Sequence, residues 1–238
     1  MKVTLLNFTP NARQILVYTK NTRLSVSANM LDKVHSMSDE EIQRELDYMV
    51  NTIKSSWEFV DATFCIEGVS RGFTHQFVRN RLGSYAQQTM RILDMGDFDY
   101  ITGPSIENNP RLKSLYDTMM GSINQYYKRL ISAGAKIEDA RGILPTNIST
   151  NIVCKFNLRA LSQMMLSRAS NRTQDEYRQV LDAMYAAVVE AEPWCASFLR
   201  SSKYDDLKRL ESAILDCYEG TDMCTQLLKL IDKVRNNG

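Results

Sequence analysis

Apolar residues recur every three or four positions along most of the chain, which predicts a mainly helical protein. Ile42, Leu46 and Met49 follow a capping box made by Ser38 and Glu41, and together they predict a helix over 38–54. The same spacing predicts further helices over 110–133, 137–143, 147–155, 158–169 and 173–190, and amphipathic segments within 201–238. In the longest of these, 110–133, the stripe expected to face the core is Leu112, Leu115, Met119, Ile123, Tyr127 and Leu130.

One segment changes to a period of two, which is the period of a strand with one buried face. Val60, Ala62, Phe64 and Ile66 alternate with Asp61, Thr63, Cys65 and Glu67. Residues 2–8 and 14–19 are the segments expected to supply partner strands. Ser70 is placed to cap a helix that Gly83 ends, and residues 84–91 are expected to be extended or irregular.

These patterns predict an α+β fold, a single domain in which a small, mainly antiparallel sheet packs with several helices. The domain is expected to span residues 1–200, and residues 201–238 form a helical C-terminal extension. Neither an internal repeat nor a low-complexity linker divides the chain.

Composition narrows the class of protein. With 44% hydrophobic and 24% charged residues, the chain resembles an ordinary globular protein. No apolar run approaches eighteen residues, and the N-terminus turns polar too early for a signal peptide. The five cysteines are odd in number and form no C-x-x-C pair, which favours reduced thiols. We therefore expect a cytoplasmic protein with no membrane association.

The distribution of charge is more informative than the net value of +1. No acid lies between Glu67 and Asp94, a segment that holds Arg71, Arg79, Arg81 and Arg91. No acid lies between Asp139 and Asp175 either, where the basic residues are Arg141, Lys155, Arg159, Arg168 and Arg172. Two such segments favour a localised site for a phosphate-bearing ligand over solvated helix faces that lack acids, and near-neutral charge argues against a general nucleic-acid coat.

The sequence lacks the residue patterns of several common types of catalytic and binding site. The two histidines, His35 and His75, are forty positions apart and no H-E-x-x-H occurs, so no metal site is expected. Neither a nucleophile elbow nor a glycine-rich phosphate loop is present. Cys195 could be a nucleophile, but a cysteine beside Trp194 is more often part of the packing. Arginine, amide and hydroxyl groups bind and polarise without moving protons, so an enzyme built from them needs a cofactor.

The arginine pattern resembles a family signature. Arg79-Asn80-Arg81, seven residues, Thr89, one residue and Arg91 is similar to the Arg-His-Arg, seven residues, Ser, one residue, Arg of flavin-dependent thymidylate synthases. Four further segments resemble that family in order: Ser56–Phe59 upstream, and Ala140–Pro145, Asn157–Leu161 and Leu166–Ala169 downstream. Phe59, Asn80 and Thr89 stand where the family has histidine, histidine and serine.

The resemblance implies FAD as cofactor, with NADPH and methylenetetrahydrofolate as co-substrates, dUMP as substrate, and a homotetramer that binds no nucleic acid. The residues implied for FAD are Ser55, Arg79, Asn80, Arg81, Gln87, Asn157, Arg159 and Gln163. Those implied for the nucleotide are Gln76, Arg79, Gln87, Gln88, Thr89, Met90, Arg91, Arg141 and Arg168. Arg168 is the implied catalytic residue, because a fixed guanidinium beside the pyrimidine favours the negative charge that activates C5.

Two alternatives stay open at this point. The departures at Phe59, Asn80 and Thr89 allow a relative that modifies C5 of another pyrimidine nucleotide such as dCMP. A protein that binds nucleotides or RNA without catalysis is the other, although aromatic residues are not interleaved with the basic ones beyond Tyr85.

Overall fold

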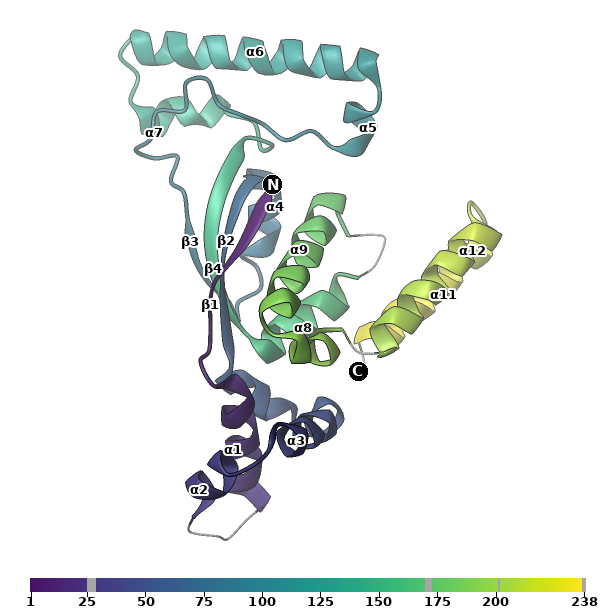
Figure 1. Cartoon of the computed structure of the whole chain (residues 1–238). Coiled ribbons are helices and arrows are strands. Elements are labelled where there is room, and N and C mark those ends of the chain that lie inside the picture. Colours follow the sequence, from purple (N-terminus) through teal and green to yellow (C-terminus); the bar gives the residue numbers. More distant parts are fainter. Residues whose placement is uncertain (25–28, 170–172, 201, 237–238) are drawn as a thin grey trace.

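The structure, a computed structural model, describes residues 1–24, 29–169, 173–200 and 202–236. A four-stranded antiparallel sheet lies at its centre, in the order β1-β2-β4-β3. The strands are β1 (Lys2–Phe8), β2 (Asp61–Ser70), β3 (Ser84–Gln87) and β4 (Ser149–Asn157). Figure 1 shows helices at both ends of this sheet and beside it, which confirms the predicted α+β class.

The described part of the chain holds twelve α-helices and three 3₁₀ turns in addition to the sheet. The helices before β4 are α1 (Ala12–Leu24), α2 (Met30–His35), α3 (Asp39–Thr52), α4 (Arg71–Phe77), α5 (Pro104–Glu107), α6 (Pro110–Ser132) and α7 (Ile137–Ala140). After β4 come α8 (Leu158–Ser167), α9 (Asp175–Ala191), α10 (Ala196–Leu199), α11 (Ser202–Tyr218) and α12 (Asp222–Asn236). The 3₁₀ turns are η1 (Lys54–Phe59), η2 (Arg141–Ile143) and η3 (Pro193–Cys195).

The local signals at α3 and β2 are confirmed. Ser38 caps α3 through a complete capping box with Glu41, and Ile42, Leu46 and Met49 are buried. On β2, Ala62, Phe64 and Ile66 are buried, so the period-two pattern does mark one core-facing side. The core continues into α8 and α9 through residues such as Leu161 and Val180.

Three predicted elements are wrong. Residues 14–19 lie in α1, where Leu16 and Val17 are buried against neighbouring helices. The strand preference of the β-branched residues is overridden by this packing. Residues 147–155 form most of β4 and not a helix, since Thr150, Ile152, Cys154 and Phe156 alternate on the buried face. The helix capped by Ser70 ends at Phe77, well before Gly83, because the chain must turn there to enter β3.

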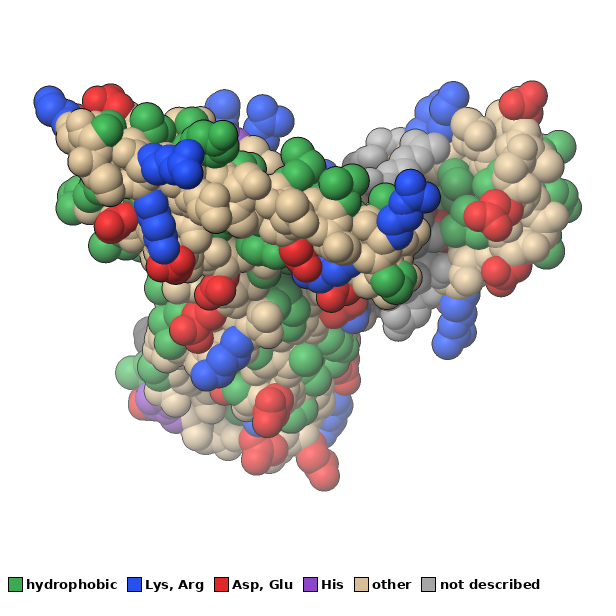
Figure 2. Space-filling view, turned by 90° about the horizontal axis from the view of Figure 1, so that it is seen from above, with side chains coloured by type: hydrophobic (Ala, Val, Ile, Leu, Met, Phe, Trp, Pro, Cys, Tyr) green, Lys and Arg blue, Asp and Glu red, His purple; other side chains and the backbone are tan. Residues whose placement is uncertain are grey.

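Helix α6 also departs from the expected burial. Of its predicted inner stripe, Tyr127 is buried, whereas Leu112, Leu115, Met119 and Leu130 are exposed, as is Tyr126. Figure 2 shows hydrophobic side chains along this outer face. The amphipathic pattern was real, but in the single chain much of its apolar side has nothing to pack against.

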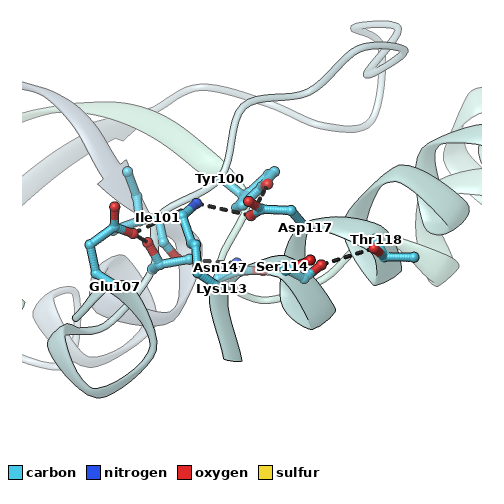
Figure 3. Close-up of polar contacts among 9 residues, drawn as sticks. Tyr100, Ile101, Glu107, Lys113, Ser114, Asp117, Thr118 and Asn147 are labelled. Carbon is cyan, nitrogen blue, oxygen red and sulfur yellow. Dashed lines mark hydrogen bonds and ion pairs between the residues drawn. The ribbon is translucent and has the colours of Figure 1, made fainter. Parts of the chain in front are cut away.

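A polar network attaches α5 and α6 to the sheet. Figure 3 shows Tyr100 and Lys113 converging on Asp117, with the Tyr100 hydroxyl 2.5 Å and the Lys113 ammonium 2.9 Å from the same Asp117 oxygen. Asn147, just before β4, donates its side-chain amide to the Ile101 carbonyl at 3.1 Å. Helix α6 contacts α7 and η2, so this network also fixes the place of Arg141.

Candidate active site

The first arginines of the signature lie in the turn between α4 and β3. Ser70 caps α4 by accepting the Phe73 amide hydrogen at 2.9 Å. The Tyr85 hydroxyl donates to the carbonyls of Phe77 at 3.1 Å and Asn80 at 2.7 Å, which holds the turn. Burial raises the pKa of Tyr85, so its hydroxyl keeps the proton that it donates.

Gly83 is required by this turn, because a Cβ at that position would lie 2.4 Å from the Phe156 ring. The side chains of Arg79 and Arg81 are exposed, and neither makes an ion pair or hydrogen bond with another described residue. The turn therefore presents two uncompensated guanidinium groups, a donor set suited to the phosphates of a dinucleotide.

Three glutamines predicted for the site are held by named partners. The Gln87 amide donates to the Thr74 hydroxyl at 2.6 Å, and the Gln76 amide donates to Gln174 at 2.7 Å. Gln88 accepts the Asn151 amide hydrogen at 3.2 Å, which ties the end of β3 to β4. Each glutamine is thereby fixed in orientation by a residue distant in sequence.

A second arginine group forms where the loop after β3 meets α7 and η2; we call Arg71, Arg91 and Arg141 the arginine corner. Arg91 Nε lies 3.2 Å from a carboxylate oxygen of Glu138, and Arg141 Nε donates to the Glu138 carbonyl at 3.2 Å. Arg71 donates to the Gln88 carbonyl at 3.1 Å. Burial, and then the charge of Arg141, lower the pKa of Arg71.

The arginine corner brings together residues from three separate segments. Arg91 and Arg141 were predicted together as nucleotide ligands, and the structure places both on Glu138. Arg71 was not among the predicted site residues; its signal was its position in an acid-free segment. The neighbouring Thr89 accepts the Arg91 amide hydrogen at 3.1 Å, and Met90 beside it is half-buried.

Arg168 lies apart from the arginine corner. It caps the C-terminus of α8, and its guanidinium carbon is 5.4 Å from the centre of the Tyr177 ring. A cavity of about 210 Å³ adjoins it, lined also by Arg178 and Arg200. Arg178 pairs with Asp175 and Arg200 with Asp182, whereas Arg168 has no ion pair among the described residues. Its charge is therefore uncompensated.

The remaining residues predicted for the cofactor lie around η1 and the start of α8. Asn157 caps α8 by accepting the Ala160 amide hydrogen at 2.8 Å, and Arg159 pairs with Glu58 at 2.6 Å. The Ser55 hydroxyl accepts from Arg23 at 2.6 Å, a contact that sequence reasoning missed. Gln163 is exposed on α8. Asn80 lies in the turn between α4 and β3, with its side-chain oxygen accepting from the Leu82 amide at 3.3 Å.

Cys195 belongs to the packing and not to a nucleophilic site. It is fully buried, and burial followed by the charge of Glu192 raises the pKa of its thiol. Across the described ranges, no group of three or more His, Cys, Asp or Glu side chains could hold a metal ion. Within the same ranges, no helix is long and apolar enough to cross a membrane.

Comparison with known proteins assigns the chain to one enzyme family. The family model described as "Thymidylate synthase complementing protein" matches residues 4–194, so the chain is a member of that family. More particularly, it belongs with the flavin-dependent thymidylate synthases, as the sequence resemblance predicted. The protein of that name from Clostridium tetani is 30% identical over 210 residues, covering 81% of this chain and 84% of that protein. The one from Thermococcus onnurineus is 37% identical over 143 residues, or 58% of each chain.

A solved structure shares the fold. Thymidylate synthase X from Helicobacter pylori, crystallised with FAD and dUMP, superimposes with a TM-score of 0.64 over 84% of this chain and 99% of its own, at 18% identity. The family match stops at residue 194, before α11 and α12, and the division into a 1–200 domain and a 201–238 extension stays a prediction from the sequence.

Proposed function

We propose that this chain methylates C5 of dUMP to form dTMP, with methylenetetrahydrofolate as carbon donor, FAD as cofactor and NADPH as reductant. The observation that carries the proposal is the set of guanidinium groups without compensating carboxylates, Arg79, Arg81 and Arg168, in a chain whose relatives are flavin-dependent thymidylate synthases. When bound, FAD supplies the hydride that reduces the transferred carbon.

The residues of the chain divide the work of binding. In this proposal the arginine corner holds the nucleotide phosphate, since only Arg91 of the three contacts a carboxylate, that of Glu138, whereas Arg71 and Arg141 donate to backbone carbonyls. Arg79 and Arg81 face the cofactor's phosphates, together with the amide of Gln87. Ser55, Asn157 and Gln163 contribute further polar groups from η1 and α8, although Arg159 must then share its charge with Glu58.

Arg168 acts on the pyrimidine. A guanidinium keeps its proton at any working pH, so it stabilises negative charge on the N3–C4–O4 side of the ring without transferring a proton itself. Tyr177 positions it: the ring lies under the guanidinium and is itself fixed by Phe73 and Phe77. No cysteine nucleophile is needed, which accords with the burial of Cys195.

The homotetramer implied by the resemblance also belongs to this proposal. Within one chain no contact among the described residues joins Arg168 to the arginine corner. The exposed apolar side of α6 offers a surface on which copies could assemble and bring such groups together. A cytoplasmic location and the absence of nucleic-acid partners stay predictions from the sequence.

The test is single-turnover oxidation of the reduced enzyme in the presence of dUMP and methylenetetrahydrofolate. Arg168→Ala should slow this step by about 30- to 1000-fold, the equivalent of about 2–4 kcal/mol of lost charge stabilisation. Lys33→Ala, which removes an exposed basic side chain on α2, is the control. A wild-type rate in Arg168→Ala would remove Arg168 from the mechanism.

The substrate is tested by thermal protection with dUMP and dCMP in parallel. A nucleotide at about 100 times its dissociation constant should add about 2.7 kcal/mol to the free energy of unfolding. We expect dUMP to protect at lower concentration than dCMP. The reverse order would assign the enzyme to a different pyrimidine while leaving the flavin chemistry in place.

A further inference from the structure

Helices α11 and α12 form an antiparallel hairpin with a small core of its own. Leu207 and Ile214 of α11 pack against Cys224 and Ile231 of α12. Outside the hairpin, α12 contacts α8. A two-helix unit of this size buries little apolar surface, so its stability depends on further contacts.

A second apolar stripe on α12 lies beside this core, and one of its members, the partly buried Leu227, also packs against the core. Met223, Leu227, Leu230 and Val234 follow one another at intervals of four, three and four residues, the spacing of a helix-packing seam. Met223, Leu230 and Val234 are 53%, 56% and 51% exposed. Three large side chains in one row, each more than half exposed, are the feature of an interface and not of a solvated surface.

Helix α11 extends the stripe on the same side of the hairpin. Leu210 is 50% exposed and directly precedes the buried Glu211, just as Met223 precedes Cys224 and Leu230 precedes Ile231. In two antiparallel helices, the residue one position before each core residue lies on the same side of the pair. Leu210, Met223 and Leu230 therefore share one side of the hairpin. The hairpin therefore has a two-helix apolar face, which we define as Leu210, Met223, Leu227, Leu230 and Val234.

The charges around this face differ between the two ends of the hairpin, so two hairpins that lie antiparallel bring opposite charges together. At the turn between the helices the exposed charges are the acids Asp216, Glu219 and Asp222. Toward the open end, the exposed charges described are Arg209 of α11 and Lys229 and Lys233 of α12, against one exposed acid, Asp206. An antiparallel pair of hairpins sets acids against bases, whereas a parallel pair sets like charges together.

We propose that this face binds the same face of a second copy of the chain, forming an antiparallel four-helix bundle around a two-fold axis between Leu227 and Leu230. About that axis Met223 lies opposite Val234 of the second copy, and Leu227 lies opposite its Leu230, so the stripe is complementary to itself. The contact lies outside residues 4–194, the part that matches the family, and does not rest on the proposed reaction.

Cross-linking tests the contact in the full chain. In a Cys217→Ser background, which removes an exposed thiol, Leu230→Cys should be joined to a second chain by a short bis-maleimide. Thr225→Cys, exposed on another face of α12, is the matched control and should give little dimer. Unchanged helical circular dichroism and nucleotide protection would show that both variants are folded.

Three results would overturn the proposal. If Leu230→Cys and Thr225→Cys give equal amounts of cross-linked dimer, the cross-links come from random collisions between chains. Rapid labelling of Leu230→Cys by a monofunctional maleimide with no dimer means that the face is free or binds a different protein. Protection of Leu230→Cys from labelling, again without dimer, means that the chain's own residues cover it.

Discussion

Glu176 on α9 caps the start of α4 through Ser70. One carboxylate oxygen accepts the Ser70 amide hydrogen and the other accepts the Ser70 hydroxyl hydrogen, each at 2.6 Å. The Ser70 oxygen in turn accepts from Phe73, so the two helices share one hydrogen-bonded unit. Arg71 and Gln76 lie on α4, which makes Glu176 a positioning residue for two groups of the site.

We expect Glu176→Gln to lower the free energy of unfolding by about 1.5–3 kcal/mol, because an amide cannot accept both hydrogens and the bonds lose their charge. Urea unfolding measures the change. Glu190→Gln, an exposed position on the same helix, is the control and should stay within about 0.5 kcal/mol of the wild type. Equal stability of the two variants would contradict the capping role.

Arg71→Gln should weaken dUMP binding by about tenfold or more, since a charged hydrogen bond to phosphate contributes about 1.5–3 kcal/mol. Calorimetric titration with dUMP and with deoxyuridine separates the phosphate from the rest of the ligand. Binding of deoxyuridine should be unchanged. If both ligands weaken equally, Arg71 acts only by holding the Gln88 carbonyl.

Glu138→Gln should tighten dUMP binding, because it removes the one carboxylate that competes with a phosphate for Arg91. The ion pair is exposed, so the gain is about two- to fivefold, or about 0.4–1 kcal/mol, and smaller in high salt. The control is Asp139→Asn, which removes one negative charge at the adjacent residue but leaves the Arg91–Glu138 ion pair in place. If Asp139→Asn increases the affinity for dUMP by the same factor, the effect comes from net charge and not from competition for Arg91.

The capping box of α3 should make stability depend on pH. Hydrogen bonds from the Ser38 backbone and side chain lower the pKa of Glu41 in the folded chain. A lowered folded pKa stabilises the fold above the unfolded pKa, and this contribution disappears as the pH falls through the folded value. Wild type should therefore exceed Glu41→Gln in stability at about pH 6, with the gap closing toward about pH 3.

Glu40→Gln controls for the helix dipole in that measurement, because Glu40 also lies in the first turn but its exposed side chain makes no hydrogen bond or ion pair with another described residue. A pH dependence of the same size in Glu40→Gln would assign the effect to the dipole and not to the capping box.

Thiol labelling distinguishes the packed cysteines from the exposed one. Burial raises the pKa of Cys154 to about 12 and also raises that of Cys195, so neither forms thiolate at neutral pH in the folded chain. Cys217 is exposed and should react first with iodoacetamide, as read by mass spectrometry of peptides. Fast native labelling of Cys195 would reopen its role as a nucleophile.

The sequence by itself determined the features whose information lies within one turn or one strand. The capping box of Ser38 and Glu41 and the cap at Ser70 are short-range geometries, so reading them needed no partner. The alternation in β2 likewise reported its buried face. The family resemblance also needed only the sequence, because a fixed spacing of residues can be compared directly, and the comparisons confirm the family.

Only the tertiary structure decided the features that depend on distant partners. Residues 14–19 and 149–157 carry similar apolar and β-branched content, and what made one a helix and the other a strand was packing on α3 or pairing with β2. The arginine corner exists because strand pairing sets Gln88 beside Asn151, 63 positions away, and a hydrogen bond from Arg71 to Gln88 follows. Such convergence is a property of register and of contacts between distant segments, and a single stretch of sequence does not contain it.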